Sequence, residues 1–319
     1  MERPLVSVIC LCYNHERFVE EAIESVLLQT YPHLQVIVVD DFSSDRSATV
    51  ISGIVSRSSR EIKYLPLQQN LGNCKAFNVG LKHATGDFII DFSTDDIMLP
   101  NRVDEQVNFF LQQNEKTGVV FTDAVYIDER GIPFKNHFEH LFKKKLIDGV
   151  PTGDIFRNVL TTYFISSPTM MIKREVMESL GGYDENLAYE DFDFWVRSSR
   201  NFEYAFLNKR LTKVRKISGS MSSGWYEPGD PQLHSTYLVC KKAETLCRDE
   251  KDIAALRKRV LYEFRQSIFS NNKDEGRLFA QLLSLLGGLP FWCYGIQLLS
   301  HLPLPWSGIR KRYQQLFFG

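Results

Sequence analysis

Short apolar runs that alternate with segments of helical spacing constrain the fold of this chain more than any other feature. The runs 4–14 and 34–41 are continuous and β-branched, as in strands buried on both faces of a parallel sheet. Segment 18–29 between them repeats apolar residues at helical spacing, at Val19, Ala22, Ile23, Val26 and Leu27. The alternation continues through residue 128. It predicts an α/β domain with a mostly parallel central sheet flanked by helices.

The same reading assigns most of the chain to elements. We expect strands at 62–67, 87–92 and 118–128, and helices after the capping residues 43–47 and at 73–84 and 100–114. From about 129 to 162 the pattern weakens, which indicates a loop-rich connection. Residues 168–200 then predict a strand, a short helix, a Gly-Gly turn and a helix that starts near Glu190. Two parts follow: a domain of residues 1–230 and a helical extension of residues 231–319.

Polar side chains follow three of the predicted strands. Asn14 ends the first, Asp40 and Asp41 end the second, and Asp95 and Asp96 follow the fourth. Parallel sheets bind ligands at the carboxyl ends of their strands, near the topological switch point. Adjacent carboxylates repel each other, so a metal ion, a ligand or a helix N-terminus must compensate them. The alternatives are a turn-capping role for the first pair and a first-turn acid for Asp96.

Charge and cysteine content limit the functional classes. With 38 Lys and Arg against 39 Asp and Glu, the net charge of −1 argues against general nucleic-acid binding. The six cysteines form no C-x-x-C pair and the N-terminal residues contain no signal-peptide core, so we expect reduced thiols and a cytoplasmic protein. Residues 231–319 carry 13 basic and 7 acidic side chains, which suggests that this part meets an anionic surface.

Five segments of the chain, in this order, resemble one known family: VSVICLCYN, VIVVDDFSSDRS, NLGNCKAFNVGLKHATGDFI, STDDIMLP and GGYDENLAYEDFDFWVR. Their order and spacing are similar to those of family 2 glycosyltransferases, which are inverting enzymes with the Rossmann-like GT-A fold. The resemblance covers about residues 4–225. It implies a nucleotide-sugar donor, with a UDP-sugar as the expectation, and a role in bacterial surface-polysaccharide synthesis.

The resemblance implies a metal site after the fourth strand. Asp95 and Asp96 match the family's DxD segment and would bind Mg²⁺ or Mn²⁺, and Thr94 would border the donor. Ser93 stands where many members have the first carboxylate. Because Mg²⁺ needs only one or two protein carboxylates when phosphates are present, Asp95 would be the direct ligand.

The donor pocket follows from the same resemblance. Asp40 or Asp41 would accept a hydrogen bond from the nucleotide base, with a slight preference for Asp41. Further nucleotide-sugar residues would be Cys12, Tyr13, Asn14, Asn70, Asn78 and Arg215. Asn78 is expected to hydrogen-bond toward the metal segment. A histidine of many relatives is replaced by Ile217, and Arg215 or Lys216 would then supply positive charge to the diphosphate.

The catalytic pair is implied by the segment YEDFDFW. A sugar hydroxyl needs a base to take its proton as it attacks the anomeric carbon of the donor. Asp191 matches the family's base, and Glu190 would orient the acceptor or support the loop. The structural alternative is that both carboxylates only favour the positive end of a helix.

The C-terminal part contains 32 residues, 278–309, without a single Asp, Glu, Lys or Arg. Glycines and prolines interrupt this run, and three basic residues follow it. The pattern favours contact of residues 278–312 with a membrane surface, peripheral at the inner face of the cell membrane. A spanning helix and packing on the catalytic domain or on a second subunit, as in a homodimer, are the alternatives.

The sequence therefore predicts an inverting, metal-dependent glycosyltransferase that acts on a glycan or a lipid-linked saccharide. Two rivals remain. A nucleotidyltransferase would carry a glycine-rich basic loop after the first strand, where this chain has CYNHERF. A non-catalytic protein that binds sugar nucleotides, or a scaffold, is the other, since Ser93 and Ile217 depart from the family pattern.

Overall fold

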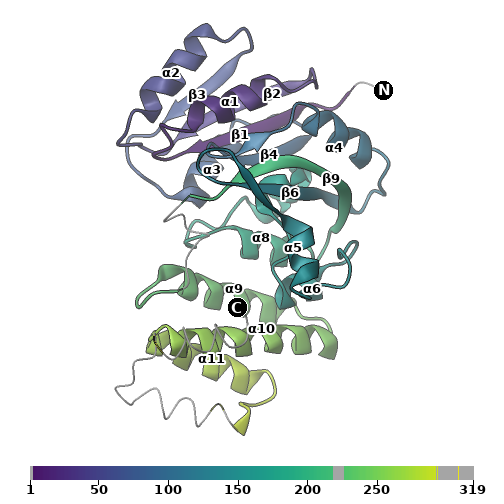
Figure 1. The fold of residues 1–319 in the computed structure, drawn as a ribbon. Helices are drawn as coiled ribbons and strands as arrows, with labels where there is room; N and C mark the ends of the chain where they lie inside the picture. Colours follow the sequence, from purple (N-terminus) through teal and green to yellow (C-terminus); the bar gives the residue numbers. More distant parts are fainter. Residues whose placement is uncertain (1–2, 218–225, 292, 294–307, 309–319) are drawn as a thin grey trace.

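A nine-stranded mixed sheet forms the centre of the computed structural model, which describes residues 3–217, 226–291, 293 and 308 (Figure 1). Its main path has the order β3-β2-β1-β4-β8-β6-β9-β5, and β7 pairs with β6. The strands are β1 Val6–Cys12, β2 Leu34–Asp40, β3 Ile62–Pro66, β4 Phe88–Ser93, β5 Ile97–Met98, β6 Thr117–Ile127, β7 Pro133–Asn136, β8 Met171–Lys173 and β9 Glu203–Arg215.

The first four strands are parallel, and β1, β2 and β4 are largely buried on both faces. Along β1, Val8 and Cys10 pack in one apolar cluster, whereas Ile9 and Leu11 pack in another. The first cluster contains α1 Val19–Leu27, α2 Ser47–Arg57 and α4 Arg102–Phe110; the second contains α3 Asn73–Leu81. Helices on both faces explain why these strands read as continuous apolar runs. The expected α/β fold with a mostly parallel sheet is confirmed.

The region 129–162 is more ordered than its sequence predicted. It contains β7, α5 His137–Lys143 and α6 Phe156–Thr161, so the expectation of a loop-rich connection is wrong for these segments. Each helix has at most seven residues, which is too short to produce a clear helical period. Strand β9 was also missed, because three polar exposed residues, 208–210, interrupt its apolar pattern.

The later helices bring the catalytic segment and the C-terminal part together. After β8 come α7 Arg174–Leu180 and α8 Asp191–Ser198, followed by α9 Pro231–Leu246, α10 Glu250–Phe269 and α11 Lys273–Leu285. Figure 1 shows α9, α10 and α11 stacked beneath α8. One apolar cluster runs without a break from β1 through α8 into these three helices. The expected helical extension is confirmed.

The long uncharged run begins within this packed extension. Phe279, Leu282 and Leu283 of α11 are buried, and the Phe279 ring lies edge-on to Tyr237 of α9 at 5.6 Å. Most of residues 292–319 lie outside the described residues, so the membrane contact predicted for 278–312 stays a prediction. Among the helices in the described ranges, none combines the length and the apolar character needed to cross a bilayer.

Candidate functional site

The carboxyl ends of β1, β2 and β4 meet at one edge of the sheet, as predicted. Cys12 of β1 is in register with Asp40 of β2, and Leu11 is in register with Ser93 of β4. The chain runs from β1 to β2 and β3 on one side, whereas β4 lies on the other, so the direction of the strand order changes at β1. The three polar clusters that follow these strands are therefore neighbours at a topological switch point.

Asn14 and Asp40 are joined through a serine. The Ser43 hydroxyl donates to Asp40 Oδ1 at 2.5 Å and accepts from the Asn14 backbone N–H at 2.9 Å. Asn14 Oδ1 accepts the backbone N–H of Ser44 at 2.8 Å. Asn14 has a positive φ of 57°, a conformation that asparagine tolerates. The loops after β1 and β2 are thus fixed to each other.

Phe42 is a candidate residue that the sequence did not reveal. Its φ is 62° and its side chain is 55% exposed, directly after the Asp40–Asp41 pair. A bulky residue in the left-handed region is uncommon, and such strain often occurs at ligand sites. Tyr13 on the neighbouring loop is 47% exposed. Two aromatic rings therefore face solvent beside the predicted base pocket.

Asp41 holds the loop that precedes α3. Its Oδ1 accepts the Leu71 N–H at 2.7 Å, and its Oδ2 accepts the Gly72 N–H at 2.9 Å. Asn70 Nδ2 donates to the Asp41 carbonyl oxygen at 3.3 Å. Burial raises the pKa of Asp41, while the two backbone hydrogen bonds lower it. The buried backbone carbonyl of Cys12 accepts the Asp41 N–H at 2.8 Å.

The predicted metal segment is anchored to β1 and β9. The buried Thr94 hydroxyl donates to the Leu11 carbonyl oxygen at 2.9 Å, and Asp96 Oδ1 accepts the Arg215 N–H at 2.8 Å. Asp96 is 2% exposed, and burial and the neighbouring Asp95 raise its pKa well above the usual range. Asp95 is partly exposed, and its Oδ1 accepts the Ser93 hydroxyl at 2.5 Å.

The oxygen atoms of Asp95 fit a cation whose coordination shell is completed by a bound ligand. Within the described residues, no group of three or more His, Cys, Asp or Glu side chains lies close enough to hold a metal ion. A Mg²⁺ or Mn²⁺ ion would therefore take Asp95 from the protein and its other oxygens from a diphosphate and water. That coordination is usual for Mg²⁺ beside phosphates.

Arg215 and Lys216 have different surroundings. The Arg215 guanidinium donates to the backbone carbonyls of Asp95, Asp128 and Glu129 and pairs with Glu21 at 2.7 Å. Arg215 therefore holds the predicted metal segment through hydrogen bonds to its backbone and to Asp96. Burial lowers the pKa of Lys216, and attraction to Asp96, Asp95 and Asp191 raises it. Lys216 therefore interacts electrostatically with carboxylates of the predicted metal segment and with the predicted base.

Asn78 contacts a different segment from the one expected. Its Nδ2 donates to the Tyr183 carbonyl at 2.9 Å and to Glu185 at 3.0 Å, and its Oδ1 accepts the Tyr183 N–H at 3.0 Å. These bonds fix the Gly-Gly turn rather than the segment around Asp95. Gly182 is required there, because a Cβ atom on it would lie 2.5 Å from Asn78 Oδ1.

Glu190 and Asp191 stand at the start of α8. A third carboxyl group, from another element, interacts with them, and the sequence did not reveal it. Asn73 of α3 donates to Glu190 Oε2 at 2.5 Å. Burial raises the pKa of Asp191, and hydrogen bonds from Ser167 and Glu190 lower it. Burial, Asp191 and Asp91 raise the pKa of Glu190 well above its usual range.

The third carboxyl group is Asp91 of β4. The Tyr183 hydroxyl donates to its Oδ2 at 2.9 Å. Burial raises the pKa of Asp91 to about 7, with a further contribution from Asp191 and an opposing one from Tyr183. A lone carboxylate within the apolar run of β4 was the available signal.

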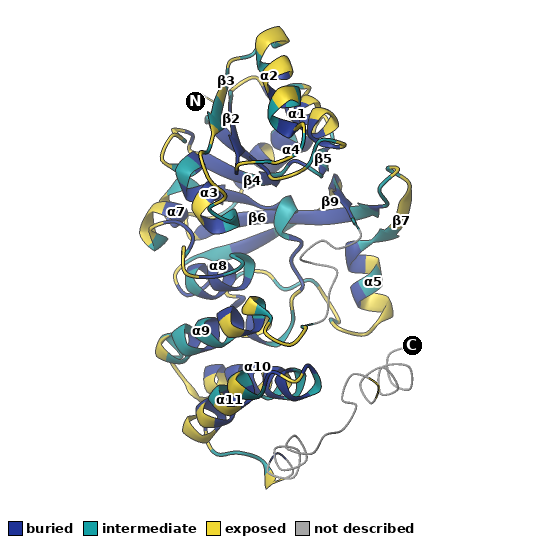
Figure 2. Cartoon of the chain, turned by 90° about the vertical axis from the view of Figure 1, so that its left-hand side faces the viewer, coloured by how far each residue is buried: buried dark blue, intermediate teal, exposed yellow. Residues whose placement is uncertain are grey.

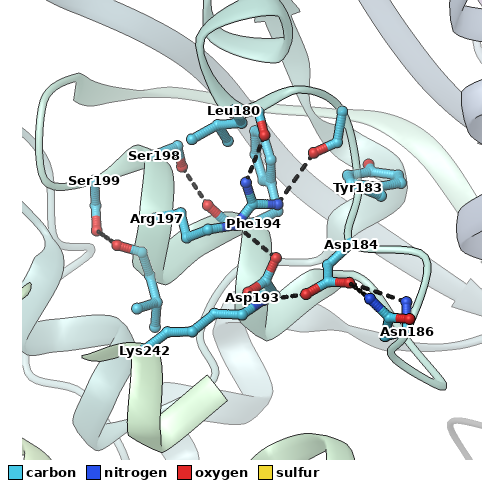
Figure 3. Close-up of polar contacts among 12 residues, drawn as sticks. Leu180, Tyr183, Asp184, Asn186, Asp193, Phe194, Arg197, Ser198, Ser199 and Lys242 are labelled. Carbon is cyan, nitrogen blue, oxygen red and sulfur yellow. Dashed lines mark hydrogen bonds and ion pairs between the residues drawn. The ribbon is translucent and has the colours of Figure 1, made fainter. Parts of the chain in front are cut away.

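Helix α8 is held from the C-terminal extension. Figure 3 shows Asp193 of α8 between Arg197 and Lys242. Both cations lie 2.6 Å from its oxygens, and Lys242 of α9 also contacts Asp184 at 2.5 Å. Arg197 donates to the carbonyl oxygens of Leu180 and Gly182. The turn 180–186, α8 and α9 therefore form one network.

A Rossmann-like sheet with carboxylates at its switch point, faced by an acidic helix start, is the arrangement of a sugar-nucleotide-dependent GT-A protein. Residues 7–181 match the family described as Glycosyl transferase family 2. An uncharacterised glycosyltransferase of Methanocaldococcus jannaschii is 30% identical over 218 residues, which cover 67% of this chain and 72% of that protein. EpsE of Bacillus subtilis is 28% identical over 285 residues, which cover 87% and 96%. The chain therefore belongs to glycosyltransferase family 2.

Solved structures share the fold. The structure of S. aureus TarS 1–349 in complex with UDP-GlcNAc has a TM-score of 0.66 and 19% identity, covering 98% of this chain and 92% of that one. The mannosyltransferase PcManGT of Pyrobaculum calidifontis, in complex with GDP-Man and Mn²⁺, has a TM-score of 0.57 and 17% identity, covering 99% and 81%. At these identities the likeness confirms the GT-A fold.

Proposed function

We propose that the protein is an inverting, metal-dependent glycosyltransferase that moves a sugar from a UDP-sugar to a hydroxyl group of a glycan or lipid-linked saccharide. Cell-surface polysaccharide synthesis is the proposed setting. The observation that carries the proposal is the position of Lys216, which interacts with Asp95, Asp96 and Asp191 together. Burial lowers the pKa of Lys216 and attraction to these three carboxylates raises it, which supports a position of Lys216 between the metal segment and the acidic helix start. The complex of TarS with UDP-GlcNAc supports a nucleotide-sugar donor.

The donor's base lies at the loops after β1 and β2. The Asp40–Asp41 pair accepts the base N–H, and Tyr13, Asn14 and Cys12 border it. Asn70 and Gly72 shape the loop below the donor, because Asp41 fixes them through hydrogen bonds at 3.3 and 2.9 Å. Lys216 supplies positive charge to the diphosphate, since the Arg215 guanidinium is already bonded to backbone carbonyls and Glu21.

Asp95 is the proposed protein ligand of Mg²⁺ or Mn²⁺. Asp96 accepts the Arg215 N–H, and Arg215 donates to the Asp95 carbonyl oxygen, so Asp96 positions Asp95 through Arg215. When bound, the ion offsets negative charge on the departing diphosphate. The complex of PcManGT with GDP-Man and Mn²⁺ supports a divalent cation at such a site.

Asp191 acts as the general base. It accepts the proton of the acceptor hydroxyl while that oxygen bonds to the anomeric carbon, and the bond from this carbon to the diphosphate oxygen breaks in the same step. A single displacement inverts the anomeric configuration. Glu190 keeps its proton, donates a hydrogen bond to Asp191, and is held by Asn73. A base must be ionised, and the hydrogen bonds that Asp191 receives from Ser167 and Glu190 favour its ionised form.

Calorimetry with UDP, GDP, CDP and dTDP, each with and without Mn²⁺, tests the donor site. We expect tight binding of UDP that requires both Mn²⁺ and Asp95, so Asp95→Ala should abolish the Mn²⁺-dependent part. Asp40→Asn and Asp41→Asn then decide which carboxylate reads the base. Failure of all four nucleotides to bind would contradict the proposal and favour the non-catalytic scaffold.

A further inference from the structure

Residues 130–146, called the arm below, project from the edge of the sheet. The arm consists of the turn before β7, β7 itself, α5 and the three residues 144–146 that follow α5. Figure 2 shows β7 and α5 at the margin of the molecule, beyond β6 and β9. One side of the arm is anchored, because the buried Phe138 packs on Phe121 and His137 Nε2 contacts the Phe164 carbonyl at 2.8 Å. The rest faces solvent.

The solvent-facing side of the arm is unusually apolar. Ile132, Phe134, Phe142 and Leu146 are 51%, 57%, 43% and 52% exposed. They are four of the 13 large apolar side chains that are exposed among the 283 described residues, of which the arm has only 17. Single exposed apolar residues need no explanation, but a cluster of them indicates an interaction surface.

The arm is also strongly basic. It carries Arg130, Lys135 and the triplet Lys143–Lys144–Lys145 against the single acid Glu139, a net charge of +4 on a chain whose total is −1. Lysines at a helix C-terminus stabilise the helix, which accounts for part of the triplet. It does not account for Lys145, whose φ of 53° is a position at which glycine or asparagine would cost less.

The arm is continuous with the catalytic site. Lys135 Nζ lies 4.7 Å from the centre of the Tyr126 ring, and Lys216 Nζ lies 4.9 Å from it. The Tyr126 hydroxyl contacts His137 Nδ1 at 2.9 Å. Tyr126 therefore links the base of the arm to the cation that interacts with Asp95 and Asp191. A surface that binds the arm would lie next to the acceptor side of the site.

We propose that the arm docks on an anionic lipid bilayer. Its four exposed apolar side chains enter the boundary between headgroups and acyl chains, and its lysines contact the headgroups, as in other interfacial segments. A soluble polyanion would bind the lysines but would gain nothing from the apolar cluster. The inference rests on the proposed function for one step, which is that the site beside the arm transfers a sugar. If the arm lies on a bilayer, the acceptor at this site is a saccharide carried by a lipid.

Vesicle flotation of the full chain tests the proposal. The vesicles contain either phosphatidylcholine alone or equal parts of phosphatidylcholine and phosphatidylglycerol. We expect partitioning only with the anionic lipid. Lys143→Gln, Lys144→Gln and Lys145→Gln together should weaken it on the order of 100-fold, from about 1 kcal/mol for each lysine. Phe134→Ser with Phe142→Ser should weaken it at least about tenfold.

Leu28→Ser with Leu111→Ser is the matched control, since these side chains are 69% and 63% exposed outside the arm. It should partition like the native chain. Native-like partitioning of both arm variants would overturn the proposal and place the contact elsewhere, with residues 278–312 as the first candidate. Loss in the lysine variant alone would also overturn it, because the contact would then be purely electrostatic and the apolar side chains would not enter the bilayer.

UDP calorimetry on the same variants separates the two proposals. The arm variants should bind UDP like the native chain, which also shows that they are folded. If the native chain partitions through the arm but binds no nucleotide, the arm proposal stands and the donor-site proposal fails.

Discussion

The donor-side loops and the helix that carries Asp191 are held in place by different interactions. On the donor side, short polar side chains bond to backbone groups of adjacent loops, as Asp41 does with Leu71 and Gly72. On the catalytic side, long charged side chains connect distant segments, as Lys242 does with Asp184 and Asp193. The first arrangement fixes the loops after β1 and β2 and the loop before α3 to one another, and these loops are called the donor rim below. The second arrangement makes α8, the proposed catalytic helix, depend on the C-terminal extension.

The two regions should respond differently to changes in pH and to the loss of single charges. Backbone hydrogen bonds on the donor side depend on loop conformation and change little with the protonation of distant groups. The catalytic side contains three carboxyl groups, Asp91, Glu190 and Asp191, whose pKa values are all raised. We therefore expect pH and the loss of single charges to affect the catalytic helix more than the donor rim.

The largest effect should come from Asp191→Asn, which separates the two regions by function. A general base contributes about 10²- to 10⁴-fold to the rate, so kcat should fall within that range. The affinity for UDP, measured by calorimetry, should match that of the native chain because the donor rim is unchanged. Full transfer activity in this variant would remove Asp191 as the base.

Asp91→Asn should sharpen the comparison through pH. The folded-state pKa of Asp91 is about 7, far above the ordinary value of 3.8, so its protonated form stabilises the fold. That stability is fully present below about pH 4 and is lost as the pH rises through about 7. The three-unit difference corresponds to a loss on the order of 2–4 kcal/mol.

Asparagine resembles the protonated carboxyl group, so the variant should lose less stability than the native chain between about pH 5 and about pH 8. Urea denaturation at both pH values measures the difference. Glu190 and Asp191 add slope of the same sign in both proteins, so a reduced slope is expected rather than a flat one. If the free energy of unfolding changed equally with pH in both proteins, Asp91 would be ionised throughout the range from about pH 5 to about pH 8.

Lys242→Met tests whether α9 supports the catalytic helix. Asp193 is 1% exposed and would keep only Arg197 as an ion-pair partner, so the free energy of unfolding should fall by about 2 kcal/mol. Lys241→Met, one residue earlier, is the control. Its pair with Glu244 lies on the surface, and its loss should cost less than about 1 kcal/mol. Equal effects in chemical denaturation would argue against the supporting role.

The grouping of polar residues at the sheet edge and the helix start near Glu190 were predictable from sequence, whereas the place of Asp91 beside them was not. Parallel strands place their carboxyl ends together, so Asn14, Asp40 and Asp95 could be grouped without coordinates. Side-chain direction could not be predicted. Arg215 was expected at the diphosphate, yet its guanidinium bonds to backbone carbonyls behind the metal segment.

Long-range pairing was the other limit. Asn78 and Lys242 find partners more than 45 positions away in the chain, and no local pattern indicates them. Strand β9 was missed for a related reason: it is stabilised by pairing with β6 although polar residues interrupt its apolar pattern. Tertiary contacts therefore decided what local propensity could not.

The smallest effect, and the one that tests the donor rim itself, should come from Phe42→Gly. Glycine adopts a φ of 62° without the cost that phenylalanine bears, so the free energy of unfolding should stay constant or rise by about 0.5–1 kcal/mol. If the exposed ring stacks on the donor's base, the affinity for UDP should fall at least about fivefold, because such stacking contributes about 1–3 kcal/mol. Asn271→Gly relieves a φ of 60° far along the chain and should leave UDP affinity unchanged. A variant that gains stability and keeps full UDP affinity would show that the strain at Phe42 serves the loop rather than the nucleotide.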